Sequence, residues 1–289
     1  MPWKLLHRSL ALGLGLLVVV LALTGWVLAL EPLRSHATQF AQTTANSPGP
    51  ALSLPALAQQ VQQTIPGVEA LRRQPAGTLV VYAFDGEQAQ AWRIHPASAQ
   101  VLGPYQPSLL PRWVKNLHRQ LLLGDAGRWL AASAAAALLV LSLSGWALLL
   151  RRMGGWRRLY GPVPGSALQR LHVQWGRWGV PLLVISSAAA LVLAAATQGW
   201  LETEPSLEAA EPLSTVQGSP LPPQALSALH AYRVQDLEVL RFPSADDAAQ
   251  SWEIHTQQGH GWIDRYSGKL LTWEATGPSQ WLYRWARWL

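Results

Sequence analysis

Three apolar runs constrain the fold of this chain more than any other feature of its sequence. The middle run, residues 129–150, is 22 residues long and contains no charged side chain. A helix of this length is sufficient to cross about 30 Å of hydrocarbon. Runs of similar length occupy residues 10–30 and 179–199. The sequence therefore predicts an α-helical membrane protein with three transmembrane helices.

The three runs share one pattern, which indicates an internal repeat. Each run is preceded by a Leu-His pair and reaches a Gly-Trp pair near its far end. The histidines of these pairs are His7, His118 and His172, and the glycines are Gly25, Gly145 and Gly199. A basic segment precedes the first run, but no small-x-small cleavage site follows it, which favours a retained anchor over a signal peptide.

The composition agrees with a membrane protein and excludes several functions. Only 13% of residues are charged, and 16 are tryptophan, a residue enriched at bilayer interfaces. The net charge of +6 clusters beside the apolar runs, so we expect the lipid bilayer and no nucleic acid as a partner. With no cysteine, the chain has no disulfide, no iron–sulfur cluster and no covalently attached haem. No GxSxG, HExxH or phosphate-loop pattern supports a hydrolase.

The charge distribution predicts the orientation in the membrane. A short loop after the second run contains six basic residues and no acidic one, namely Arg151, Arg152, Arg157, Arg158, Arg170 and Arg177. The positive-inside rule places this loop, and with it the N-terminus, in the cytoplasm. Four further basic residues, Arg112, Lys115, Arg119 and Arg128, precede the second run on the opposite side. They belong to a long loop, whose charges weigh less in orientation.

The segments that follow the first and the third apolar run each have the pattern of a small α+β module outside the membrane. After a polar connector (31–50), the first has a helical spacing over 53–63 and two strands, 79–84 and 91–95. In the second, we expect a helix over 224–232 and strands over 237–242, 251–255 and 270–273. The sequence Trp-x-Ile-His occurs at both 92–95 and 252–255, which predicts equivalent strands in a duplicated fold.

These patterns divide the chain into six segments. We expect transmembrane helices at 1–30, 118–152 and 172–200, modules at 31–117 and 201–289, and a cytoplasmic loop at 153–171. The last residues repeat the segment that precedes His118 and stop before a fourth Leu-His pair. A fourth helix of the repeat is therefore expected to be missing.

Several of these motifs resemble the PepSY-associated transmembrane family. They are the Leu-His-Arg before the first run, the block LHRQLLLGDAGRW that begins at Leu117, and the third Leu-His helix. The two modules resemble PepSY domains. The resemblance implies an iron-regulated protein of the bacterial inner membrane, with four helices, b-type haems held by histidine pairs and periplasmic PepSY modules. Some members reduce ferric siderophores in the periplasm.

The residues themselves also favour haem. An ionisable side chain at the edge of a membrane helix needs a partner, and two facing helices can each supply a neutral imidazole to haem iron. We expect His7 and His172 to be the axial ligands of one haem b on the cytoplasmic side. His118 is a third candidate ligand, but it has no histidine partner, so a second haem is expected to be absent or weakly bound. No residue is expected to be catalytic, and the alternative is that each histidine is an interfacial residue.

Two classes of function remain open at this stage. The first is a b-haem electron-transfer protein that takes electrons from quinol or a cytoplasmic flavoprotein and supports reduction of a ferric siderophore or another iron chelate. Whether this chain is itself a ferric-chelate reductase stays undecided. The second is a non-enzymatic, membrane-anchored PepSY protein that binds or regulates a periplasmic partner such as a protease, or an inactive fragment of the reductase. The histidine repeat favours the first, and the missing helix favours the second.

Overall fold

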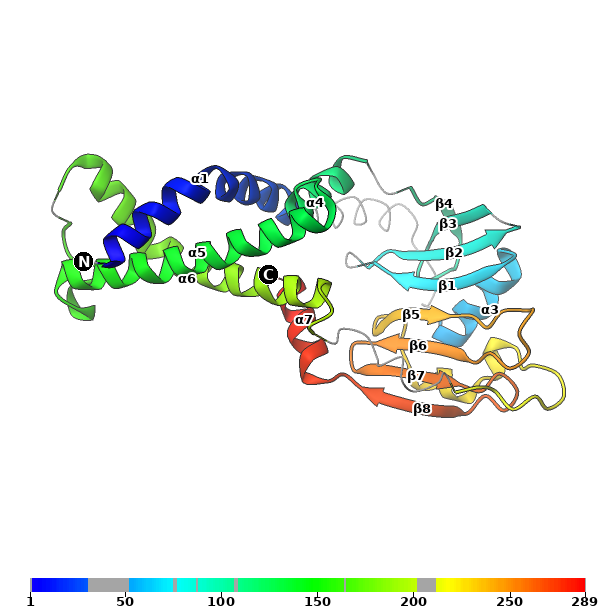
Figure 1. Ribbon diagram of the computed structural model, residues 1–289. Coiled ribbons are helices and arrows are strands. Elements are labelled where there is room, and N and C mark those ends of the chain that lie inside the picture. The colour runs from blue at the N-terminus through cyan, green and yellow to red at the C-terminus, as the bar shows by residue number, and fades with distance from the viewer. Residues whose placement is uncertain are drawn as a thin grey trace. The chain divides into compact units, whose positions relative to one another are not determined.

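The chain folds into two compact units, which we describe separately (Figure 1). The computed structural model describes residues 2–30, 52–74, 77–86, 88–106, 109–163, 165–201 and 212–288. The helical unit consists of Met1–Ala29, Leu109–Thr203 and Pro278–Leu289, and the sheet unit of Leu30–Ser108 and Glu204–Gly277. The expected connector 31–50 lies outside the described residues.

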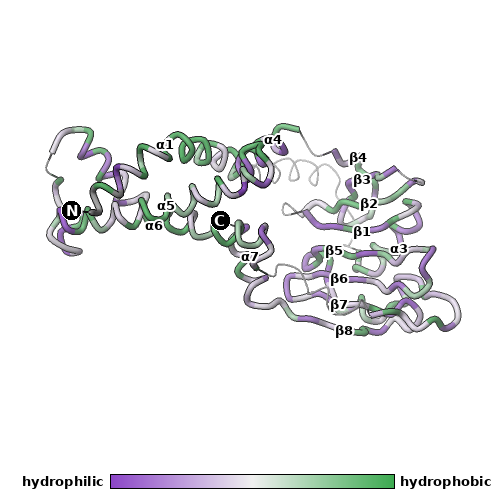
Figure 2. The backbone as a smooth tube through the Cα atoms, in the orientation of Figure 1, coloured by the Kyte–Doolittle hydropathy of each residue, from purple (hydrophilic) through white to green (hydrophobic). Residues whose placement is uncertain are grey.

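Three long helices dominate the helical unit. They are α1 (Pro2–Ala29), α5 (Gly124–Met153) and α6 (Ala167–Thr197), and α5 packs against both of the others. All three are long and apolar enough to span a membrane, which confirms the predicted number of spans among the described residues. Figure 2 shows hydrophobic residues along all three helices.

Two amphipathic helices complete this unit. Helix α4 (Leu109–Gln120) packs against α1 and α5, whereas α7 (Pro278–Trp288) packs against α6. The expected modules 31–117 and 201–289 both extended into these helices. The structure assigns α4 and α7 to the helical unit instead, because each packs on a membrane helix and continues no strand.

The block LHRQLLLGDAGRW forms the sharp turn between α4 and α5. Leu121 and Leu122 adopt left-handed backbone angles, with φ of 51° and 61°, a conformation that strains a residue with a side chain. Gly127 lies so close to the Gln120 carbonyl that a Cβ atom would stand 1.6 Å from its oxygen. Only glycine fits at position 127, and the φ of 60° at Gly124 also favours glycine.

The basic loop joins α5 to α6 through a short 3₁₀ turn, η1 (Trp156–Arg158). Helix α5 ends at Met153 and is capped by Gly154, whose φ of 75° favours glycine. Helix α6 begins after Ser166, whose hydroxyl accepts a hydrogen bond from the Gln169 amide. The guanidinium of Arg177, 8% exposed, donates to the Gly161 carbonyl at 2.7 Å. This contact holds the loop against the start of α6.

The sheet unit is built around one antiparallel sheet of eight strands. Its first half contains α3 (Leu54–Thr64), β1 (Val68–Arg73), β2 (Leu79–Asp85), β3 (Gln88–Ile94) and β4 (Val101–Pro104). Its second half contains η2 (Pro223–Ala225), η3 (Ser227–Ala231), β5 (Leu237–Arg241), β6 (Trp252–Thr256), β7 (Gly259–Ile263) and β8 (Leu270–Ala275). The order β4-β3-β2-β1-β5-β6-β7-β8 shows that the two expected modules share a single sheet.

The two halves of the sheet meet at the antiparallel pair β1–β5. Leu71 of β1 lies opposite Leu240 of β5, and neither side chain is exposed. Both belong to one hydrophobic core, which also contains Leu57 and Val61 of α3. Because the core crosses the β1–β5 pair, the two expected modules are joined in one folded unit.

The expected helix over 224–232 was wrong. The segment forms the two 3₁₀ turns η2 and η3, which are separated by Leu226 in an extended conformation, with φ of −74° and ψ of 98°. Leu226 is fully buried in the core. Burial of this side chain outweighs the helical propensity of its neighbours.

The strand order of the two halves confirms a duplication, but the predicted match between their strands was wrong. Residues 92–94 lie in β3, the third strand of the first half, whereas 252–255 lie in β6, the second strand of the other half. The turns after β3 and β7 do match, since His95 and Gln100 exchange the same backbone hydrogen bond as Asp264 and Lys269. The Trp-x-Ile-His match arises because alternation of apolar and polar residues is common to many strands.

We predict that Leu240→Ala lowers the free energy of opening of β1 and β5 by about 2–5 kcal/mol, because it leaves a cavity where the two halves meet. Hydrogen–deuterium exchange of peptides from these strands measures this free energy. The matched control is Leu270→Ala in β8, whose side chain is 42% exposed and should cost much less. Equal effects of the two substitutions would contradict a shared core across the β1–β5 pair.

Candidate functional site

The structure brings His7 and His172 together, as the sequence predicts. His7 lies near the start of α1 and His172 near the start of α6. Their ring centres are 6.5 Å apart, and the ring planes form an angle of 71°. Helices from the two halves of the repeat thus present equivalent histidines to each other.

The His7 ring also contacts α5. Its Nδ1 atom lies 3.1 Å from the Ser144 hydroxyl oxygen. At the next position, a Cβ atom on Gly145 would stand 3.3 Å from Cε1 of His7. Glycine therefore lets the imidazole lie directly against the α5 backbone.

His118 has the same kind of environment on another pair of helices. It lies near the end of α4, and its Nδ1 atom is 3.0 Å from the Thr24 hydroxyl and 3.1 Å from the Leu21 carbonyl oxygen of α1. A Cβ atom on Gly25 would stand 3.1 Å from Cε1 of His118. Within the described part of the chain, no other histidine ring contacts this one.

The two histidine sites lie at opposite ends of α1. Eighteen residues separate His7 from Gly25, which corresponds to about 27 Å along a helix. Burial lowers the pKa of His118, so its imidazole is neutral at pH 7. Neutral imidazole is the form that binds a metal ion.

The His7–His172 pair fits the axial ligation that the sequence predicts. Two imidazoles that bind one metal from opposite sides, each at about 2 Å, have ring centres about 6 Å apart, close to the observed 6.5 Å. In the described ranges, no group of three or more His, Cys, Asp or Glu side chains is placed to hold a metal ion by itself. A two-histidine site suits an iron whose other ligands come from a macrocycle such as haem.

Comparison with known protein families decides the identity of the chain. The model of the PepSY-associated TM region matches residues 4–289. The chain belongs to this family. No curated protein matches it. Membership in the PepSY-associated TM family, together with the three apolar helices, makes the chain a multi-pass membrane protein.

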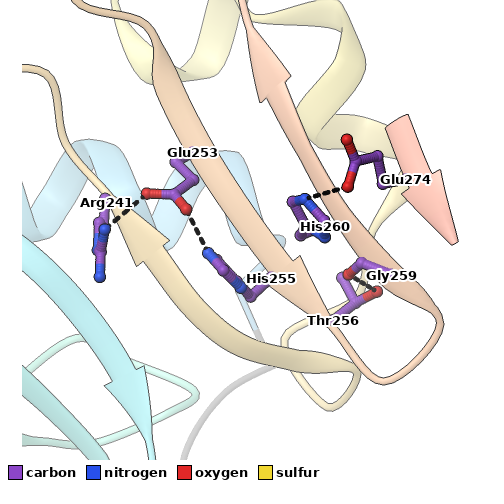
Figure 3. A network of polar contacts seen from close by, with 7 residues as sticks. All are labelled: Arg241, Glu253, His255, Thr256, Gly259, His260 and Glu274. Atoms are coloured by element: carbon purple, nitrogen blue, oxygen red, sulfur yellow. Dashed lines mark hydrogen bonds and ion pairs between the residues drawn. The ribbon is translucent and has the colours of Figure 1, made fainter. Parts of the chain in front are cut away.

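The sheet unit of this PepSY-associated protein contains a second cluster of polar side chains (Figure 3). His255 of β6 and His260 of β7 are cross-strand partners, with stacked rings whose centres are 5.5 Å apart. Each histidine contacts a carboxylate, His255 that of Glu253 and His260 that of Glu274. Arg241 of β5 donates to the other oxygen of Glu253 at 2.9 Å. The cluster thus links strands β5 to β8.

Sequence reasoning gave His260 no role and missed this cluster. The signal that could have found it is the short turn between β6 and β7, which places residues 255 and 260 opposite each other. His260 is 3% exposed, and this burial lowers its pKa although the Glu274 carboxylate acts in the opposite direction. Burial alone raises the pKa of Glu253, but the hydrogen bond from His255 and the charge of Arg241 outweigh it, so the net pKa is lowered.

We predict that the β6–β7 hairpin becomes less stable as the pH falls from 7 to 5. The pKa of His260 is lowered in the folded state, so the unfolded chain binds its proton more readily below about pH 6.5. Glu253 contributes in the same direction only at lower pH, as its carboxylate protonates. Hydrogen exchange of the hairpin, corrected for intrinsic rates, measures the effect. His260→Gln should reduce the pH dependence, and an unchanged dependence would contradict this assignment.

Proposed function

We propose that this chain is an inner-membrane electron-transfer protein that binds one haem b between His7 and His172. The observation that carries the proposal is the 6.5 Å separation of these two rings, which come from equivalent positions of a repeat. Bound haem would supply one-electron redox chemistry. His7 and His172 would hold its iron, and the apolar helices α1, α5 and α6 would exclude water from it.

The charge distribution supports an orientation for this protein. The arginine-rich loop around η1 lies at the same end of the helical unit as His7 and His172, because it connects the end of α5 to the start of α6. The positive-inside rule then puts this end in the cytoplasm and the sheet unit in the periplasm. On this basis the His7–His172 pair would receive electrons from quinol or a cytoplasmic flavoprotein.

The acceptor that we propose is a ferric siderophore or another iron chelate in the periplasm. His118 lies at the opposite end of α1 from His7, so of the three candidate ligands it would be the one on the acceptor side. Because no second histidine ring contacts His118 among the described residues, it would bind a second haem weakly or not at all. Support for an iron chelate comes from the resemblance to family members that reduce ferric siderophores.

A second candidate function is that of a membrane-anchored PepSY protein that binds a periplasmic partner such as a protease. The observation that favours it is the sheet unit, which has a hydrophobic core of its own. The two functions differ in whether the purified chain contains haem.

We predict that His7→Ala or His172→Ala abolishes most of the haem absorbance of the purified protein, because each would remove one of the two residues proposed to hold the iron. His118→Ala should change the absorbance little. The matched control is His230→Ala in the sheet unit, where the exposed ring lies 3.0 Å from the Gln224 carbonyl oxygen. Full haem content in both His7→Ala and His172→Ala would refute the proposed site, and a colourless wild-type protein would favour the second function.

We also predict the result of reporter fusions at two positions. After Arg158, green fluorescent protein, which works in the cytoplasm, should be active and alkaline phosphatase, which works in the periplasm, should be inactive. After residue 210, the reverse should hold. The reverse pattern would overturn the proposed orientation.

A further inference from the structure

The two histidine sites are built by the same arrangement of side chains. In each, a histidine faces a hydroxyl residue followed by glycine on a neighbouring helix, Ser144-Gly145 for His7 and Thr24-Gly25 for His118. In both copies the hydroxyl residue directly precedes the Gly-Trp pair of the sequence repeat. The third copy has Gln198 in place of a hydroxyl residue. The repeated geometry indicates a shared role for the hydroxyl groups.

The contacts of His118 fix the position of its ring proton. A backbone carbonyl only accepts hydrogen bonds, so Nδ1 of His118 must carry the proton that it shares with Leu21. The Thr24 hydroxyl donates its own proton to the Val20 carbonyl at 2.8 Å, so it too accepts from this N–H. The lone pair of the neutral ring is therefore on Nε2.

The contacts of His7 lead to the same tautomer. The Ser144 hydroxyl donates to the Leu141 carbonyl at 3.1 Å, which leaves its lone pairs to accept from Nδ1–H of His7. This contact favours a proton on Nδ1 of His7, which leaves the lone pair of Nε2 available to a metal.

We propose that Ser144 and Thr24 are positioning residues that hold His7 and His118 as Nδ1–H tautomers with Nε2 free for ligation. This proposal rests on the proposed haem function for its purpose, although the tautomers themselves do not require haem. A hydrogen bond from the second ring nitrogen fixes the orientation of a ligating histidine and raises its basicity. Gly145 and Gly25 make these bonds possible, since a side chain there would push the ring away from the helix.

The two sites should differ in their dependence on the hydroxyl. His118 donates within bonding distance to both Thr24 and Leu21, so it keeps an acceptor when the hydroxyl is removed. For His7, the hydrogen bond of Nδ1 is the one to the Ser144 hydroxyl, at 3.1 Å. Ser144→Ala should therefore disturb the tautomer of His7 more than Thr24→Val disturbs that of His118.

The first test uses the full chain in detergent without haem, labelled with ¹⁵N-histidine. In the wild type, the ¹⁵N shifts of His7 and His118 should show a protonated Nδ1 and an unprotonated Nε2, with His7→Gln and His118→Gln providing the assignments. Ser144→Ala should move His7 toward a mixture of tautomers, and Ser144→Thr should restore it. The matched control is Ser142→Ala, because the buried Ser142 hydroxyl has no hydrogen-bond partner among the described residues.

The second test uses the haem-loaded protein. Ser144→Ala should weaken haem binding about 10–100-fold and raise the midpoint potential, because a less basic imidazole stabilises ferric iron less. Ser142→Ala should leave both unchanged. An unchanged tautomer and potential in Ser144→Ala would overturn the positioning role even if haem is bound. A wild type with the expected tautomers but no haem would instead refute the proposed function and leave the positioning of the rings standing.

Discussion

An imidazole at the end of an apolar helix needs a polar partner, because hydrocarbon offers it none, and the helical unit depends on how this need is met. His7 finds Ser144 on α5, and His118 finds Thr24 on α1. Each contact fixes the approach of two helices, and the adjoining glycine brings the backbone close enough to form it. The same contacts that satisfy the rings also leave one nitrogen of each free, so the requirement for helix packing and the requirement for ligation are met by one arrangement.

Duplication explains why His7 and His172 meet. The packing of α4 against α1 is repeated by that of α7 against α6, and the two halves of the sheet meet at the equivalent strands β1 and β5. Equivalent positions of two related halves can face each other, as they do across a symmetric dimer interface. The rings of His7 and His172 lie in this way, so a two-histidine site needs only one histidine per half.

The sequence predicted the helical unit better than the sheet unit, for physical reasons. Length and hydropathy mark a membrane helix strongly, and the Leu-His repeat was enough to predict that His7 and His172 are neighbours. The role of Ser144 was not predictable, because a hydroxyl residue within an apolar helix commonly bonds its own backbone. The single sheet was missed because the β1–β5 pair joins segments far apart in the chain, and alternation alone does not specify which strands pair. The helix predicted at 224–232 does not form, because burial of Leu226 in the core outweighs the helical propensity of the segment.

The central claim is that one iron is held by the imidazoles of His7 and His172. Electron paramagnetic resonance of the oxidised, haem-loaded protein tests it most directly, because the spectrum reports both the axial ligands and the angle between their planes. Two imidazoles whose planes are 71° apart should give a strongly anisotropic low-spin ferric signal with one dominant low-field feature. A high-spin ferric signal, which indicates that one of the two histidines is not bound, would contradict the account.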